Sequence, residues 1–241
     1  MAGSVTTAVC NSWLAEVLSA GHCFLPPQAG VAVSESSGSV SGTITTPQAG
    51  IAVGMAITGT NAGAGAVVAT LGPAANAFTA SVAASGGTLT SATFTGDVFK
   101  IALINSALAG NVAYGTLTTN YGTGSGTPTQ ANLGTDEQTA SGSYSAGGLA
   151  LVPTAIVQST PVNSAAIGFS TTIQWTSATL SVAGAEIYNS SSRLSAAATP
   201  VAGRACAVYS FGGTQSVTSG TLTLTQPTQN GTTGLIRLSP N

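Results

Sequence analysis

The sequence predicts a mainly β fold, a β-sandwich or jelly-roll-like domain with a short N-terminal helix and an inserted small β module. Two observations indicate this class. Short apolar runs, bounded by Gly, Pro, Asn and Ser turn signals, follow one another along most of the 241 residues. These runs are not interleaved with the helical patterns that a parallel α/β sheet requires.

One stretch alone has helical periodicity. Within residues 11–21, Trp13, Leu14, Val17 and Leu18 fall on one face of a helix, and Gly21 suits the left-handed stop. A helix this short is marginal alone, so it must pack on something else. We therefore predict that residues 1–25 form an N-terminal arm and short helix belonging to the main domain.

Residues 26–95 predict a separate small β module. The segment Pro27–Val33 recurs as Pro47–Val53, which suggests two similar turn-then-strand units. Two copies are too few to establish a solenoid. Strand-like runs follow at Ala66–Leu71 and Ala77–Val82.

Residues 96–241 predict the main β-sandwich domain. Its strongest strand is Val98–Ile104, whose near-continuous apolarity is typical of a central core strand. A Gly-, Thr- and Ser-rich passage at about 110–148 predicts a long loop, or an arm that reaches a neighbouring subunit. Further strand-like runs lie at Leu149–Val157, Ala166–Trp175, Thr179–Tyr188, Ala205–Phe211, Gly220–Thr225 and Gly234–Leu238.

The charge content is very low. Only 4% of residues are charged and the formal net charge is −2, against about 25% charged residues in ordinary domains. Because net charge helps to keep proteins apart in solution, much of the surface is expected to be hydroxyl-rich or covered by other subunits. The four Lys and Arg residues are too few for phosphate-driven binding, so nucleic acid is excluded as a partner.

The sequence also predicts no membrane partner, since no run approaches the length of a membrane helix. Because Met1–Ser4 lacks a positively charged region, a secretory signal is not expected, and we expect assembly in the cytoplasm. Cys10, Cys23 and Cys206 have no metal-ligand spacing, and we interpret them as small buried apolar residues.

The ionisable residues predict no catalytic, cofactor or metal site. His22 is the only histidine, and we interpret it as a packed, hydrogen-bonded side chain. The adjacent acids Asp136 and Glu137 predict a solvated pair in a loop, with a weak cation site as the alternative. Glu186 is expected to pair with an arginine of a neighbour or to stay exposed. No Gly-x-Ser-x-Gly elbow or phosphate-binding loop is present.

The aromatic residues are the candidate anchors of the fold or of an interface. They are Trp13 in the expected helix and Trp175, Tyr188, Tyr209 and Phe211 in the C-terminal strands. We expect core anchors, with a carbohydrate-binding platform as the alternative, and an interface role for one or two is compatible with either.

Several motifs follow one another along the chain in a fixed order. They are Trp13–Leu18, Asp97–Ile104, Tyr144–Gly148, Trp175–Thr179, Gly184–Asn189, Ala207–Gly213 and Gly234–Leu238. This ordered set resembles a family of small tailed-bacteriophage structural proteins, whose members show a short N-terminal helix and FKIALY-, ALIYN- and DFGG-like strands. The resemblance covers residues 11–24 and 97–238 and leaves residues 26–95 as an insertion. Glu186 and Ser210 depart from the pattern.

The resemblance implies a structural virion protein rather than an enzyme. Together with the low charge and the β-rich pattern, it favours a decoration or cement protein of a bacteriophage capsid. We expect a homo-oligomer, a trimer, that contacts the major capsid protein or other virion proteins and stabilises the assembled head. The alternatives are a tail, collar or fibre component of the virion and, in a different class, a carbohydrate-binding adhesin module.

Overall fold

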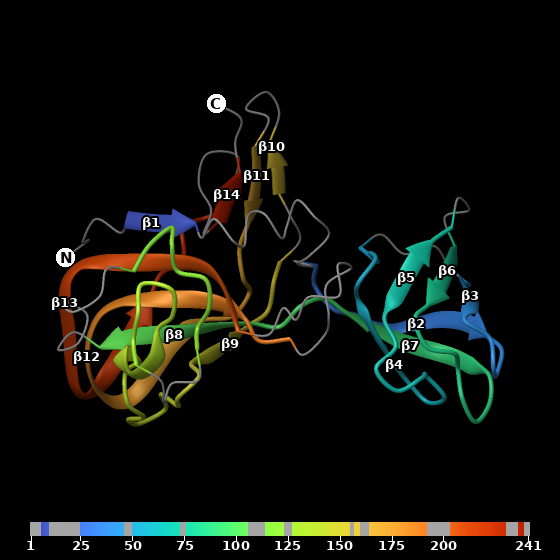
Figure 1. Cartoon of the computed structure of the whole chain (residues 1–241), viewed down its shortest axis with the longest axis horizontal. Helices are drawn as coiled ribbons and strands as arrows, with labels where there is room; N and C mark the ends of the chain where they lie inside the picture. Colours follow the sequence, from blue (N-terminus) through green and yellow to red (C-terminus); the bar gives the residue numbers. More distant parts are fainter. Residues whose placement is uncertain are drawn as a thin grey trace.

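The chain is described by a computed structural model, and its fold is mainly β, as the sequence predicts (Figure 1). The predicted helix at residues 11–21, with Trp13, lies outside the described residues. No helix in the described part is both long and apolar enough to cross a bilayer. The structure describes residues 6–9, 25–45, 50–72, 76–105, 114–122, 127–154, 157–159, 164–191, 203–229 and 236–238.

The described strands form three antiparallel sheets. Their order is β1-β13-β12-β8-β9 in the first, β10-β11-β14 in the second and β4-β7-β2-β3-β6-β5 in the third. The strands are β1 (Thr6–Val9), β2 (Gln28–Glu35), β3 (Ser41–Ile44), β4 (Ala56–Thr58), β5 (Val68–Leu71), β6 (Ala77–Ala80), β7 (Leu89–Thr95), β8 (Phe99–Asn105), β9 (Leu149–Leu151), β10 (Val157–Ser159), β11 (Ser164–Ile167), β12 (Ile173–Asn189), β13 (Arg204–Leu224) and β14 (Ile236–Leu238).

The six-stranded sheet is a nearly closed barrel made only of β2 to β7. Its two end strands meet, because Ile57 N–H donates to the Ala66 carbonyl at 2.8 Å and Val68 N–H donates to the Met55 carbonyl at 2.9 Å. Inside the barrel, the rings of Phe78 and Phe94 pack edge to face, with their centroids 5.7 Å apart. The barrel therefore has its own core, and Figure 1 shows it as a distinct group of strands.

The internal repeat does not give two similar strands. Pro27–Val33 enters β2, but the described part of Pro47–Val53 contains no strand. There the chain turns: Met55 N–H donates to the Ala52 carbonyl at 3.3 Å, and Gly54 takes a φ of 88°. Since Gly adopts that left-handed conformation without steric cost, the residues after the second copy allow a turn in place of a strand.

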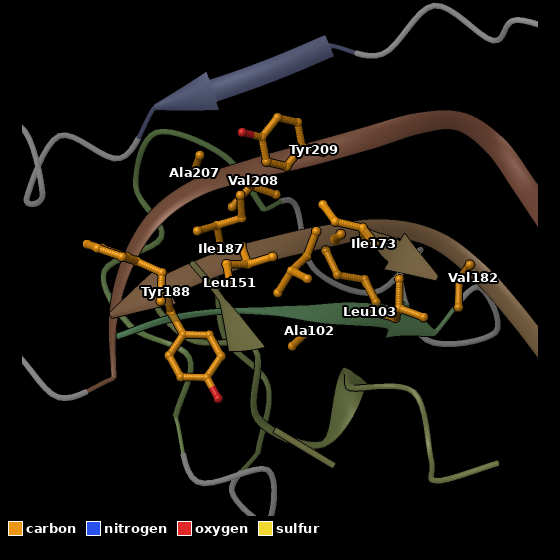
Figure 2. Close-up of a cluster of buried hydrophobic side chains, with 14 of the residues drawn as sticks. Ala102, Leu103, Leu151, Ile173, Val182, Ile187, Tyr188, Ala207, Val208 and Tyr209 are labelled. Carbon is orange, nitrogen blue, oxygen red and sulfur yellow. The ribbon is translucent and has the colours of Figure 1, made fainter. Parts of the chain in front are cut away.

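The larger hydrophobic core packs on the five-stranded sheet, and Figure 2 shows part of it. The predicted central strand is confirmed: β8 pairs with β12 on one side and β9 on the other. The long strands β12 and β13 pair along most of their length, with several register shifts that bend the ribbon. Cys206 of β13 is buried, as expected for a small apolar residue.

The predicted strand Ala166–Trp175 is divided between two sheets. Its first part joins β11 and its last part begins β12. Between them the backbone is held by the Gln226 side chain, which accepts from Phe169 N–H at 3.1 Å and donates to the Thr171 carbonyl at 2.9 Å. These bonds replace the strand ladder at the corner, which the local apolar pattern does not reveal.

The long loop predicted at about 110–148 is present in its described parts, 114–122 and 127–148, but it is not an extended arm. Leu133 is 0% and Tyr144 is 1% exposed, and both belong to the core of the five-stranded sheet. We call these described parts the covering loop. Composition alone indicated a solvated segment, because the apolar anchors are few and widely spaced.

Candidate functional site: acidic side chains buried beneath the covering loop

The site lies on one face of the five-stranded sheet. Glu186 of β12 is directly opposite Ala102 of β8 and Val208 of β13, and Tyr188 is opposite Lys100. Cross-strand partners project to the same face of a sheet. Figure 2 accordingly shows Tyr188 and Ala102 on one side of the ribbon, away from the side chains that fill the opposite side.

The covering loop is fixed to the outer edge of β8. Gln138 N–H donates to the Leu103 carbonyl at 2.8 Å, and Leu103 N–H donates to the Tyr144 hydroxyl at 3.0 Å. An isolated bridge also joins Ile104 and Glu137. β9 pairs only with the first part of β8, and Leu103 lies beyond that part. The loop satisfies both backbone groups of Leu103 there, and this holds the loop beside the face that carries Glu186.

Two consecutive glycines allow the loop to approach so closely. Gly147 and Gly148 have φ values of 89° and 75°, a region that other residues rarely adopt. A Cβ on Gly148 would lie 2.0 Å from the Ile101 carbonyl oxygen. The run Tyr144–Gly148, which carried part of the family resemblance, is therefore the segment that docks the loop on β8.

Glu137 is the hub of the hydrogen bonds beneath the loop. Its Oε1 accepts from the Tyr144 hydroxyl at 2.8 Å and from Gly147 N–H at 2.7 Å, and its Oε2 accepts from the Tyr121 hydroxyl. These three donors compensate the carboxylate for the loss of water. Burial is the main cause that raises the pKa of the Tyr144 and Tyr121 hydroxyls, and Glu137 adds to it.

Aromatic stacking completes the cover. The rings of Tyr121 and Tyr188 stack with centroids 4.3 Å apart and planes inclined by 10°. The Tyr188 hydroxyl donates to the Gly147 carbonyl at 2.7 Å. Nearby, the Tyr114 hydroxyl donates to a carboxylate oxygen of Asp136, so the loop joins each of its own acids to a tyrosine.

Glu186 differs from these acids because no described residue forms a hydrogen bond with its carboxyl group. It is 0% exposed, and among the described residues neither of its carboxyl oxygens has a hydrogen-bond partner. Burial raises the pKa of Glu186 well above its ordinary value of 4.5, and the nearby Glu137 raises it further. The neutral, protonated form is therefore the one that this position favours.

These positions correct two expectations from the sequence. Asp136 and Glu137 are not a solvated pair, since they are 1% and 7% exposed. Glu186 is neither exposed nor paired with a described arginine. A sequence signal did exist, because Tyr114, Tyr121 and Tyr144 flank the acid pair within one loop, but the tertiary fold brings their hydroxyls onto the acids.

The candidate aromatic anchors are buried wherever the structure describes them. Trp175 is 1% exposed and packs edge to face against Tyr144 at 5.7 Å, so it offers no platform for a sugar. Tyr188, Tyr209 and Phe211 are 5%, 5% and 8% exposed and belong to the same core. Their position is that of core anchors.

The buried acids do not form a metal centre within the described residues, where no group of three or more His, Cys, Asp or Glu side chains could hold an ion. The oxygens of Glu137 are occupied by hydrogen-bond donors, and Glu186 is closed off from solvent. What the arrangement can do chemically is hold a proton on the Glu186 carboxyl beneath the covering loop.

A separate groove of about 320 Å³ lies on the barrel, between β2, β3, β5 and β6. It is lined by hydroxyl side chains together with two glycines and with Ala77 and Phe78, and Thr70 and Thr79 hydrogen-bond each other there at 2.7 Å. No charged residue lines it. The hydroxyls come from Ser34, Ser41, Thr43, Thr70 and Thr79.

Comparison with known proteins adds no relative from which a role could be transferred: no family model, curated protein or solved structure matches this chain.

Proposed function

We propose that this chain is a structural subunit of a virus particle, a decoration protein on the head of a bacteriophage. One observation supports the assembly role above all. Five of the 6 acidic residues lie in the described part of the chain, and all five are buried, at 2%, 3%, 1%, 7% and 0% exposure for Glu35, Asp97, Asp136, Glu137 and Glu186.

The described surface is consequently almost uncharged. Lys100 and Arg204 are only partly exposed, and no acidic side chain faces solvent within the described ranges. Such a surface lacks the repulsion that keeps monomers apart. It suits contact with other protein through backbone, hydroxyl and apolar groups, as in a subunit that is held in an assembly.

The bacteriophage assignment draws on the ordered motifs that resemble tailed-phage structural proteins. Their structural use supports it in part: Tyr144–Gly148 docks the covering loop, and Asp97–Ile104 supplies the central strand β8. In a decoration protein these features would make a rigid body, and the uncharged surface would add contacts across capsomer junctions.

Copy number tests the proposal. Quantitative mass spectrometry of particles from the host that carries this coding sequence should find this chain in hundreds of copies, in a fixed ratio to the major capsid protein. A few copies would favour the tail, collar or fibre alternative. Absence from purified particles would overturn a virion role.

Association of the isolated chain gives a second test. Sedimentation at rising protein concentration should reveal oligomers, and 0.05 to 1 M salt should not weaken them, because screening acts on charges that this surface lacks. Dissociation by salt would contradict the role assigned to the uncharged surface, and a monomer at all concentrations would contradict the expected homo-oligomer.

A carbohydrate-binding module is the second candidate, now favoured by the hydroxyl-lined groove of the barrel rather than by Trp175. A groove with hydroxyls and no charge suits a neutral, polyhydroxylated ligand. Thr43→Val should abolish glycan-array binding, while Thr218→Val, on the exposed part of β13, should not. Binding that survives Thr43→Val would exclude the groove.

A further inference from the structure

Glu186 is fully buried between the five-stranded sheet and the covering loop, and these two are held in different ways. β8 and β13 pair with β12 on either side of Glu186, and the ladder is regular from Gly184 to Asn189 against β8 and from Gly184 to Ile187 against β13. The covering loop lies over this face and makes only isolated bridges with the sheet. It is held at separate points by hydrogen bonds to Leu103 of β8, to Thr176, Thr179 and Tyr188 of β12, and to Gly203 and Ala205 at the start of β13. Because separate contacts can break locally while a strand ladder persists, we take the covering loop to be the part that opens.

The groups around Glu186 offer little compensation for a negative charge. β13 places the apolar Val208 opposite it, and β8 places Ala102 there. Lys100 projects to the same face but makes no hydrogen bond to Glu186. The other titratable groups are Tyr188 on β12 and, from the loop, Tyr114, Tyr121, Asp136, Glu137 and Tyr144.

We propose that Glu186 is a proton-dependent latch: the covering loop closes on β8 and β12 while the Glu186 carboxyl is protonated, and it opens when that proton passes to solvent base. The ionised carboxylate would stand near Glu137 with no described donor to compensate it. Water is the available donor, and water reaches Glu186 only if the loop lifts.

The direction of the pH dependence follows from linkage. Burial raises the pKa of Glu186 in the closed state, whereas in the open state the pKa returns toward its ordinary value of 4.5. The closed state therefore holds the proton more tightly, and it is favoured fully below pH 4.5. As pH rises from there toward the raised pKa, the opening equilibrium should increase about tenfold per pH unit and then level off.

Hydrogen exchange with mass spectrometry tests the latch. Peptides from 114–122 and 127–148 are followed from pH 5 to 9 in the wild-type chain and in Glu186→Gln, with intrinsic exchange corrected. The matched control is Glu35→Gln, since Glu35 is also a buried acid with a raised pKa but lies on β2 of the barrel.

Protection of the loop should fall with pH in the wild type and in Glu35→Gln, and stay flat in Glu186→Gln. Equal pH profiles for the wild type and Glu186→Gln would overturn the latch. So would a wild-type profile in which loop and β12 peptides exchange with the same opening constant at every pH, because both would then exchange through global unfolding. If Glu186→Gln does not fold, the comparison of loop with β12 peptides in the wild type still decides. The latch does not depend on the proposed virion role.

Discussion

Replacing Gly148 by alanine should separate close packing from backbone strain. Gly148 has a φ of 75°, and a Cβ there would lie 2.0 Å from the oxygen and 2.5 Å from the carbon of the Ile101 carbonyl. Both atoms are backbone of β8, so no side-chain rotation relieves the overlap. The alanine variant must displace the loop or the strand.

Gly203 provides the matched control. Its φ is 77°, and a Cβ there would meet nothing within 4 Å. Ala at either position costs about 1–2 kcal/mol for the left-handed conformation. Only Gly148→Ala adds the clash, which detaches the loop and exposes part of the core. We expect a total loss of more than about 3 kcal/mol, within the range of severe single substitutions.

The assay is urea unfolding followed by Trp fluorescence, since Trp175 contacts Tyr144 of the loop. The midpoint of Gly203→Ala should fall slightly and that of Gly148→Ala should fall steeply, or unfolding should begin with the loop. Equal losses within about 0.5 kcal/mol would refute the reasoning, because both variants would then report strain alone.

Three further changes test the core and the buried acids. Trp175→Ala, which empties a 1% exposed site, should cost about 3–5 kcal/mol in urea unfolding, and a loss below 1 kcal/mol would contradict its burial. Tyr144→Phe leaves Leu103 N–H without its acceptor and Glu137 without one donor, so calorimetry should show a loss of about 1–3 kcal/mol. The free energy of unfolding of Glu186→Gln should rise relative to the wild type by about 1.4 kcal/mol per pH unit from pH 4.5 up to the raised pKa. The reason is that the wild type loses stability as Glu186 loses its proton. Urea midpoints of the two proteins that run parallel across pH would disprove it.

The strands could be predicted where their signal is local. β8 follows from the apolar run Val98–Ile104, and its central position follows from burial on both faces. The repeat misled because Pro27–Val33 and Pro47–Val53 share residues but not their continuation, and Gly54 allows a turn after the second copy. Local similarity predicts local conformation, not strand pairing.

The burial of the acids could not be predicted from local pattern, because the tyrosines that flank Asp136 and Glu137 in the loop reach them only in the folded chain. Glu137 receives one bond from Tyr121, 16 residues away, and the Tyr144 hydroxyl that binds it is positioned by Leu103, 41 residues away. Glu186 is buried by a loop whose composition is typical of solvated segments. Only the tertiary structure reveals that every acidic side chain in the described part of the chain is buried.

The barrel formed by β2 to β7 begins and ends at one point. Gln28, at the start of β2, is the cross-strand neighbour of Phe94, near the end of β7. The polypeptide thus enters and leaves through adjacent strands, so the barrel could be enlarged, exchanged or deleted across that junction without changing the distance that the rest of the chain must span before β8. Evolution could therefore change the surface of the barrel while the strand register of the five-stranded sheet stays the same.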